Sequence, residues 1–218
     1  MINIAIDGPA GAGKSTVAKA VAQKFGFIYV DTGALYRSIG VNALKHNIDT
    51  NDSEKIINLL PETKVELKYI DGNQRVFLNG IDVSEEIRFP EASMAASNVS
   101  AIPEVRDFLL NLQREIAATH NVVMDGRDIG TVILPDAEYK FFLTASPEVR
   151  AARRFKELKE KGIDVDFNAL LEEIIQRDYN DSHRKTAPLK QADDAILVDS
   201  SNMTLEESIN AIASRIKV

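Results

Sequence analysis

The sequence predicts an α/β protein with a doubly wound, five-stranded parallel sheet and helices on both faces. The prediction depends on three observations. Short apolar runs of the kind that form buried strands recur along the chain, and helical periodicity appears between or near them. The first of these runs leads directly into a glycine-rich turn and then a helix. One later segment differs from this pattern because apolar and polar residues alternate in it, which is typical of antiparallel strands.

The parallel core is predicted from five apolar runs and the helical segments near them. Val17, Val21 and Phe25 recur at helical spacing after the first run, so a helix is expected there. Strands that alternate with helices at this spacing imply a parallel sheet with right-handed crossovers. We expect strands at 2–6, 27–30, 122–124, 139–143 and 195–198, and the first two helices at 15–25 and 35–44.

The segment 63–97 is expected to form a small antiparallel insert. Val65, Leu67 and Tyr69 alternate with charged residues, so a strand here has one wet face, unlike a strand of a parallel core. The pairs Asp71-Gly72 and Asn79-Gly80 are typical of hairpin turns. These features predict three short strands joined by two tight turns.

Composition limits the class of protein. The chain has 218 residues, of which 44% are apolar and 27% charged, and it contains no cysteine, which excludes disulfides and thiolate metal sites. The net charge of −7 argues against nucleic acid as the main partner, because a duplex binder needs a basic surface. Residues 1–6 form the only apolar stretch near the N-terminus. We therefore expect no signal peptide, no membrane partner and a cytoplasmic protein.

The glycine-rich turn after the first strand matches the phosphate-binding pattern G-x-x-x-x-G-K-[ST], with a strand before it and a helix after it. Glycines let backbone N–H groups approach phosphate oxygens, and the N-terminus of the following helix favours negative charge. Lys14 is expected to reach the β- and γ-phosphates of ATP, and the Ser15 hydroxyl to bind Mg²⁺. The alternative is a structural turn with an incidental lysine. The predicted donor site comprises Gly8, Pro9, Ala10, Gly11, Ala12, Gly13, Lys14, Ser15 and Thr16.

This loop predicts the phosphoryl donor but not the reaction, since kinases, GTPases and motor ATPases all use it. The guanine-reading pattern Asn-Lys-x-Asp does not occur in the sequence. Two classes of function stay open at this point. One is a kinase of a small acceptor, and the other is a nucleotide-dependent switch or binding module with incidental hydrolysis.

Two loops at predicted strand ends are candidates for the acceptor site, because ligands of open α/β sheets bind there. The first is residues 31–37, where Arg37 is positioned to hold a phosphate and Thr32 alternatively serves only as a helix N-cap. The second is residues 125–130, which crowd two aspartates, an arginine and two glycines. Asp125 is expected to reach Mg²⁺ through a water molecule, or alternatively to stabilise the turn.

Two helices carry charged residues in patterns that favour a role at a cleft. Leu170, Ile174, Arg177, Asp181 and Arg184 recur on one face of the first, so the charges share the stripe that normally faces a core. The alternative is an exposed i,i+4 pair between Arg177 and Asp181. The second helix begins at Ser146-Pro147 and ends at Gly162, and it gathers three arginines on one face. These three either clamp a phosphoryl group or form a solvated basic face: Arg150, Arg153 and Arg154.

Taken together, these segments resemble the bacterial cytidylate kinase family over the whole chain and in the same order. The resemblance is carried by the phosphate loop, D-T-G-A-L-Y-R at 31–37, A-A-S-N-V-S-A-I-P-E-V-R at 95–106, D-G-R-D-I-G-T-V-I-L-P-D-A at 125–137, R-A-A-R-R at 150–154 and R-D-Y-N-D-S-H-R-K-T-A-P-L at 177–189. It implies transfer of the γ-phosphoryl group of ATP to CMP, and to dCMP. It also implies a core of 1–62, 98–145 and 167–218, an acceptor-binding insert of 63–97 and a mobile lid of 146–166.

The resemblance implies a role for each matching residue. Thr32, where serine is also familiar, would meet the acceptor nucleotide with Tyr36 and Arg37, and Arg37 and Arg127 would hold its phosphate. Ser97, Arg106 and Asp128 would read the cytosine with Arg184 nearby, and Arg177 and Asp181 would contact the sugar. Lys14, Arg127 and the three lid arginines Arg150, Arg153 and Arg154 would stabilise the transferring phosphoryl group.

The chemistry needs no general base, because a nucleotide phosphate with a second pKa near 6 is already largely dianionic. The three histidines lie far apart in the sequence and are given no role: His46, His120 and His183. The expected ligands are ATP, Mg²⁺ and a small nucleotide, and we expect a monomer. A kinase of another nucleotide, sugar or acid is the closest alternative.

Overall fold

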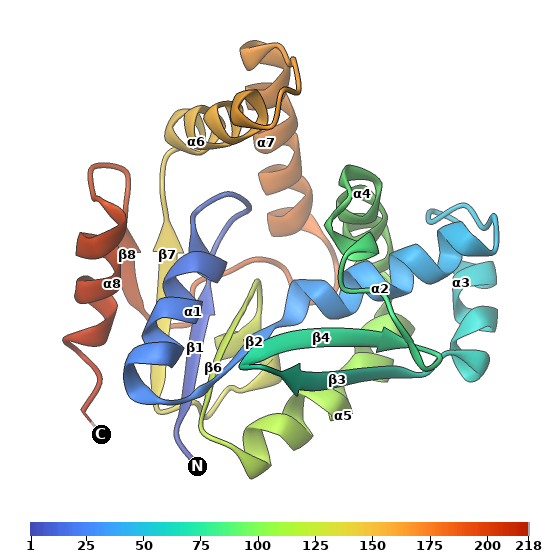
Figure 1. Ribbon diagram of the computed structural model, residues 1–218, viewed down its shortest axis with the longest axis horizontal. Helices are drawn as coiled ribbons and strands as arrows, with labels where there is room; N and C mark the ends of the chain where they lie inside the picture. Colours follow the sequence, from blue (N-terminus) through green and yellow to red (C-terminus); the bar gives the residue numbers. More distant parts are fainter. Residues whose placement is uncertain (218) are drawn as a thin grey trace. The chain divides into compact units, whose positions relative to one another are not determined.

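The computed structural model describes residues 1–217 and contains a five-stranded and a three-stranded sheet (Figure 1). The larger sheet has the order β2-β6-β1-β7-β8, and β1 pairs in parallel with both β6 and β7. All five predicted strands are present: β1 Asn3–Asp7, β2 Ile28–Asp31, β6 Val122–Gly126, β7 Tyr139–Thr144 and β8 Ile196–Asp199. The strand order reverses at β1, which is where ligands bind in doubly wound sheets.

The chain divides into two compact units. The first consists of residues up to Tyr29 and those from His120 onward. In it, helices α1 (Lys14–Phe25) and α8 (Leu205–Ala213) pack on the strands and on each other. Their apolar positions, such as Val17 and Ile212, share one core with Ile4 and Ile6 of β1. The predicted apolar face of the first helix is therefore confirmed.

Two consecutive helices follow β7 in the same unit. Helix α6 spans Pro147–Glu160 and is capped by Ser146, and α7 spans Phe167–His183. They pack on each other at the top of Figure 1, with the rings of Phe155 and Phe167 edge to face at 5.7 Å. A π-helical turn, η3 (Ile129–Ile133), follows β6, and no local pattern of residues predicts it.

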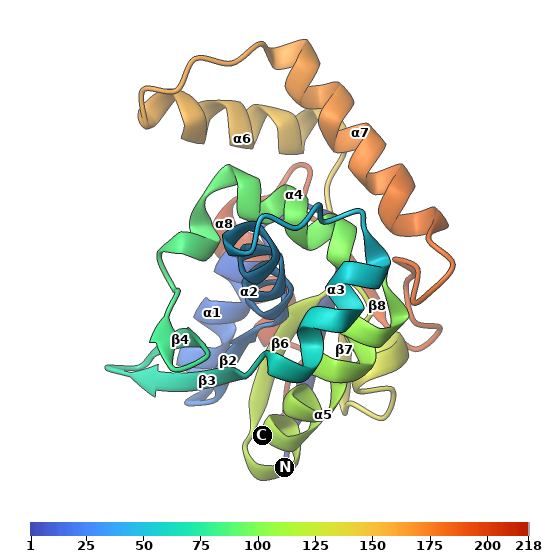
Figure 2. The ribbon, with the colours of Figure 1, turned by 90° about the vertical axis from the view of Figure 1, so that its right-hand side faces the viewer.

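The second compact unit, Val30–Thr119, is mainly helical. Leu35 and Ile39 of its central helix share a core with Val99 and Leu109. The α-helices of this unit can be followed in Figure 2. They are α2 Thr32–Lys45, α3 Ser53–Leu59, α4 Pro90–Val99 and α5 Pro103–Thr119, with short 3₁₀ turns η1 Leu60–Glu62 and η2 Glu86–Arg88.

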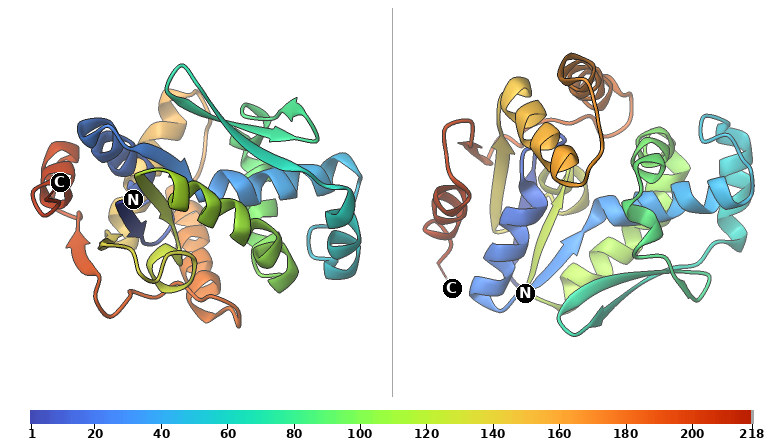
Figure 3. Two further views of the ribbon diagram at one scale, coloured as in Figure 1. Left: turned by 90° about the horizontal axis from the view of Figure 1, so that it is seen from below. Right: turned by 45° about the horizontal axis from the view of Figure 1, so that its top comes forward.

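The three predicted antiparallel strands are confirmed, but they occupy only residues 65–82; the rest of the predicted insert 63–97 contains η2 and most of α4. Strand β3 (Val65–Ile70) pairs with β4 (Asn73–Leu78), which pairs with β5 (Ile81–Asp82), and Figure 3 shows the β3–β4 ribbon from two further directions. Both connections have two residues with positive φ: 51° and 73° at Asp71-Gly72, and 50° and 84° at Asn79-Gly80. This is the type I′ geometry that the residue types predict, since it matches the twist of paired strands.

The predicted division into a core, an acceptor-binding insert and a lid is a division by function, and it stays a prediction. The last residue of the predicted core, 218, lies outside the described residues. Among residues 1–217, no helix is both long and apolar enough to cross a membrane.

Candidate active site

The phosphate loop lies between β1 and α1 and is shaped by close packing. Gly8 has φ 148°, and a Cβ at this position would lie 1.9 Å from the carbonyl oxygen of Leu143 on β7. Only glycine fits there without moving the neighbouring strand. Gly13 also has positive φ and is the N-cap residue of α1. The loop therefore ends on the amides of a helix N-terminus, which favour an anion.

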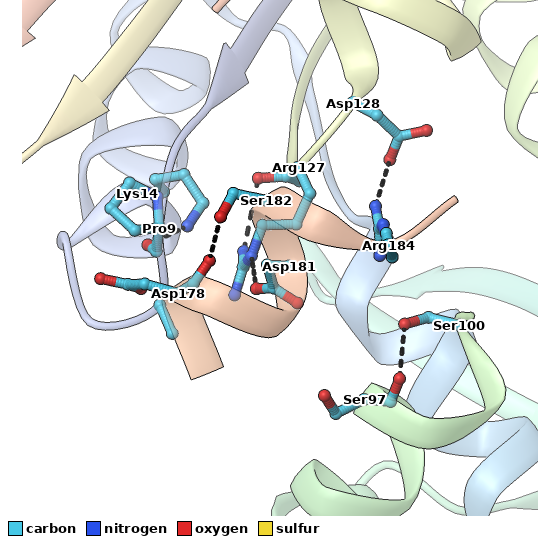
Figure 4. A network of polar contacts seen from close by, with 12 residues as sticks. Pro9, Lys14, Ser97, Ser100, Arg127, Asp128, Asp178, Asp181, Ser182 and Arg184 are labelled. Atoms are coloured by element: carbon cyan, nitrogen blue, oxygen red, sulfur yellow. Dashed lines mark hydrogen bonds and ion pairs between the residues drawn. The ribbon is translucent and has the colours of Figure 1, made fainter. Parts of the chain in front are cut away.

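Lys14 is buried in this loop, and its Nζ donates to the carbonyl oxygen of Pro9 at 2.8 Å (Figure 4). Burial, and next the positive charge of Arg127, lower the pKa of Lys14 to about 7. A phosphate group beside Lys14 would favour its charged form, because opposite charges at short range stabilise each other in a buried site. The geometry suits a lysine that binds a polyanion.

The Ser15 hydroxyl donates to Oδ2 of Asp125 at 2.9 Å, and the Tyr29 hydroxyl donates to Oδ1 of the same buried carboxylate at 2.9 Å. Oxygen ligands of this kind fit Mg²⁺, which commonly binds one or two protein oxygens together with substrate phosphates and waters. In residues 1–217, no cluster of three or more His, Cys, Asp or Glu side chains could hold a metal ion. Ser15 and Asp125 supply oxygens that fit an ion bound together with a nucleotide.

The loop after β6 holds Asp128, which is 3% exposed, at the start of η3. Arg184 lies beside it, with 3.7 Å between Nη2 of the arginine and Oδ1 of Asp128 (Figure 4). The backbone amides of Ile129 and Gly130 both donate to the carboxylate of Asp7, at the end of β1. The sequence did not single out Asp7.

Arg127 leaves the same loop and pairs with Asp181 of α7, with Nε 2.9 Å from Oδ2 (Figure 4). Asp181 and Ile174 are buried, as expected for a helix stripe that faces inward. The carboxylate of Asp181 therefore has an arginine partner from another element, which favours the inward-facing stripe over an exposed pair within α7. Arg184 is the C-cap residue of α7, so the predicted stripe continues one residue past the helix.

The three arginines of α6 have separate partners in this structure. Arg150 is 2% exposed and donates to the carbonyl oxygens of Ala145 and Ala10 and to both oxygens of Asp178 on α7. Arg153 donates to the carbonyl oxygen of Ser200 at 2.7 Å. Arg154 forms an exposed ion pair with Glu157. A shared clamp around one phosphoryl group would require these contacts to be exchanged.

The remaining predicted acceptor residues belong to the second compact unit. Arg37 pairs with Asp31 at 2.7 Å, and buried Arg106 lies over the ring of Tyr36 at 5.3 Å and donates to the carbonyl oxygen of Ser100. Ser97 is on α4, where its carbonyl oxygen accepts from the Ser100 hydroxyl (Figure 4).

The suggestion that Thr32 caps the second helix is wrong by one residue. Asp31 is the N-cap residue of α2, and its carboxylate accepts from the amide of Ala34. Thr32 is instead the first residue of the helix and is buried. An aspartate is an equally good cap, so either assignment was consistent with the sequence.

Sequence reasoning missed four residues that support the site: Asp7, Tyr29, Gln74 and Asp178. Gln74 of β4 exchanges two hydrogen bonds with the backbone of Asp31, at 2.9 and 3.2 Å. Each of the four acts on a residue far away in the sequence. Of these four, only Asp7 could have been found from the sequence, because it lies at the end of a strand predicted to be buried, where a carboxylate needs a hydrogen-bond partner.

A parallel sheet whose first strand runs through G-x-x-x-x-G-K-S into a helix defines a P-loop nucleotide-binding protein. The family model described as cytidylate kinase matches residues 4–218, and the chain belongs to this family.

Individual relatives agree with the family match. A cytidylate kinase from Caldicellulosiruptor saccharolyticus is 56% identical over 211 residues, covering 97% of this chain and 93% of the relative. One from Caldanaerobacter subterraneus subsp. tengcongensis is 55% identical over 216 residues, covering 99% and 95%. Among solved structures, an uncharacterised protein from Eubacterium ventriosum has a TM-score of 0.53 at 15% identity, covering 98% of this chain and 97% of that one, which shows the fold alone.

Proposed function

We propose that the protein transfers the γ-phosphoryl group of ATP to CMP, and to dCMP, giving CDP or dCDP and ADP. Relatives that are 55–56% identical over nearly the whole chain are named cytidylate kinase, which supports the reaction. The buried Asp128 carboxylate beside Arg184 is the structural observation that carries the choice of base. Cytosine has an N4 amino donor that a carboxylate can accept from, whereas uracil has a carbonyl oxygen there.

The donor side is assigned to the loop from Gly8 to Thr16. Its amides would hold the phosphates of ATP, and Lys14 would stabilise charge on the β- and γ-phosphates. Ser15 would hold Mg²⁺, and Asp125 would hold it through a water molecule; when bound, this ion neutralises phosphate charge. The bond from Ser15 to Asp125 supports this assignment, because it places the hydroxyl oxygen next to a carboxylate.

The acceptor side is assigned residue by residue. Thr32, Tyr36 and Arg37 would contact the acceptor nucleotide. Arg37 and Arg127 would bind its phosphate. Asp128 would accept from cytosine N4, with Ser97, Arg106 and Arg184 completing recognition of the base. Arg177 and Asp181 would bind the sugar, which fits the buried position of Asp181 on α7.

Catalysis would depend on alignment and charge neutralisation, since the acceptor phosphate is already a nucleophile. Arg153 and Arg154 would reach the transferring phosphoryl group when 146–166 closes. Each would have to give up its present partner, which is a backbone carbonyl oxygen for Arg153 and an exposed glutamate for Arg154. Arg150 is also assigned to the stabilisation of the transferring phosphoryl group. Its bond to Ala10 also supports the phosphate loop directly.

The experiment that tests this function measures ADP formation with CMP, dCMP, UMP and AMP in the presence of Mg²⁺. We expect ADP only when an acceptor is present, with CMP and dCMP preferred. ADP formed without an acceptor would indicate a switch protein, and a preference for another acceptor would indicate a different kinase.

We also propose that the protein acts in the cytoplasm as a monomer on free nucleotides, without a nucleic-acid or membrane partner. The net charge of −7 supports the absence of nucleic-acid binding. Sedimentation at several concentrations would test the oligomeric state, and retention on a DNA column would contradict the assignment.

A further inference from the structure

The N-terminus of η3 is capped by an unexpected residue. Asp128 occupies the N-cap position, where an aspartate normally accepts from the amides of the first turn, but its side chain makes no capping hydrogen bond. Asp7, which is 121 residues earlier in the chain, does so instead. Its Oδ1 accepts from the amide of Ile129 and its Oδ2 from the amide of Gly130, both at 2.8 Å.

This arrangement is built into the fold. Asp7 is 4% exposed, and a carboxylate so deeply buried is costly unless its oxygens are hydrogen-bonded. Asp7 lies opposite Gly126 in the β1–β6 register, so the chain must turn back after β6 to bring Ile129 to it. Gly130 lies directly against this carboxylate, because a Cβ there would be in van der Waals contact with Oδ2 of Asp7 at 3.4 Å and crowd Cδ of Lys140 at 3.2 Å.

The same contact connects two parts of the site. Asp7 directly precedes Gly8, the first residue of the phosphate loop, while Ile129 directly follows Asp128. Since Asp7 satisfies the amides of η3, the carboxylate of Asp128 is directed to Arg184 rather than to its own helix. An aspartate that capped η3 itself would lose this orientation.

We propose that Asp7 is a positioning residue that determines base specificity by capping η3 in place of Asp128. This inference rests on the proposed function, in which Asp128 reads cytosine. Asp7 touches neither the base nor the transferring phosphoryl group. Its effect is to hold in place the backbone of the loop that contains Arg127 and Asp128.

The test compares wild-type protein with Asp7→Asn, using the ratio of kcat/KM for CMP to kcat/KM for UMP. Asparagine is nearly isosteric but places an NH₂ group against one of the two amides, so one capping bond is lost. We expect the ratio to fall by about tenfold, since a misplaced carboxylate leaves buried polar groups of cytosine poorly paired. The ratio does not depend on the fraction of folded enzyme, so it separates positioning from a loss of stability.

A matched control is Asp52→Asn, which alters the aspartate cap of α3, whose carboxylate accepts from the amide of Lys55. Its CMP-to-UMP ratio should equal that of wild type. The double variant Asp7→Asn/Asp128→Ala should discriminate no worse than Asp128→Ala alone, because Asp7 acts through Asp128. Independent, additive losses would overturn the proposal.

An unchanged ratio in Asp7→Asn, with a raised KM for ATP, would show that Asp7 serves only the phosphate loop and would overturn the inference. If Asp7→Asn is insoluble, Asp7→Ser is assayed in the same way, with the same supporting and overturning results. A wild-type protein that does not prefer CMP would instead refute the proposed function, so the two failures are distinguishable.

Discussion

Two arginines of helix α6 pair with carboxylates that differ greatly in burial, so the two pairs are expected to contribute very different free energies. The guanidinium of Arg150 is almost fully buried and binds both oxygens of Asp178, which is 25% exposed. Arg154 and Glu157, three residues apart on the same helix, are 42% and 47% exposed. We expect Asp178→Ala to destabilise the protein much more than Glu157→Ala.

The magnitude follows from burial. Removing one partner of a buried pair leaves the other charge without compensation and typically costs about 3–5 kcal/mol. Asp178 is partly solvated, and Arg150 keeps its bonds to Ala145 and Ala10, so we expect about 3 kcal/mol for Asp178→Ala. An exposed pair contributes about 0.5 kcal/mol, which is the expected cost of Glu157→Ala.

The assay is urea unfolding of both variants at pH 7, with the free energy of unfolding extrapolated to water. Asp178→Ala should also raise the KM for ATP, because Arg150 holds the carbonyl of Ala10 in the phosphate loop. Equal free energies of unfolding for the two variants would refute the reasoning that burial separates these pairs.

Three further predictions concern activity. Lys14→Ala should lower kcat by about 100-fold or more while the circular dichroism spectrum is unchanged, since it removes charge stabilisation at the phosphoryl group; full activity would contradict a P-loop kinase. Arg154→Ala should lower kcat by about tenfold with little change in the KM for CMP, and the opposite pattern would place Arg154 in the binding site. Asp128→Ala should lose most of the CMP-over-UMP preference, a change of about 1–3 kcal/mol measured from kcat/KM, and intact discrimination would exclude Asp128 from base reading.

The fold could be predicted because its signals are local. The five buried strands, the Asn-Gly and Asp-Gly turns and the Ser146-Pro147 helix start each depend on a few adjacent residues. The π-helical turn η3 could not be predicted in this way. Its first amides are satisfied by Asp7, which is separated from Gly130 by 123 positions, and no local pattern records that contact.

The site was predictable to the extent that motifs and helix periodicity define it. The phosphate loop and the buried position of Asp181 were expected, and the structure places Ser15 on Asp125. The partners of the arginines were not predictable, because Arg150, Arg153 and Arg154 share a helix face in the sequence but have acceptors on three different segments. Partner choice depends on tertiary packing, which sequence spacing does not contain.

The cost of burying Asp7 predicts how stability depends on pH. Burial raises the pKa of Asp7 from 3.8 to about 6, against the opposing effect of the two amides; nearby Asp128 raises it further and Lys14 lowers it. Between these two values the folded state holds a proton that the unfolded state has lost. The contribution of Asp7 to stability therefore falls as pH rises from about 4 to 6, and stays low above that range.

The free energy of unfolding of wild type relative to Asp7→Asn should therefore fall by about 2–3 kcal/mol between pH 4 and pH 7, since the pKa is raised by roughly two units. Carboxylates elsewhere with lowered pKa, such as Asp82 and Glu157, act in the opposite direction, but they are common to both proteins and cancel in the difference. Urea unfolding at four or more pH values measures this difference. Parallel profiles for the two proteins would show that Asp7 is not held in the folded state with a raised pKa. A variant that is more stable than wild type at pH 7 and yet less specific for CMP would show that the buried carboxylate is kept at a cost in stability.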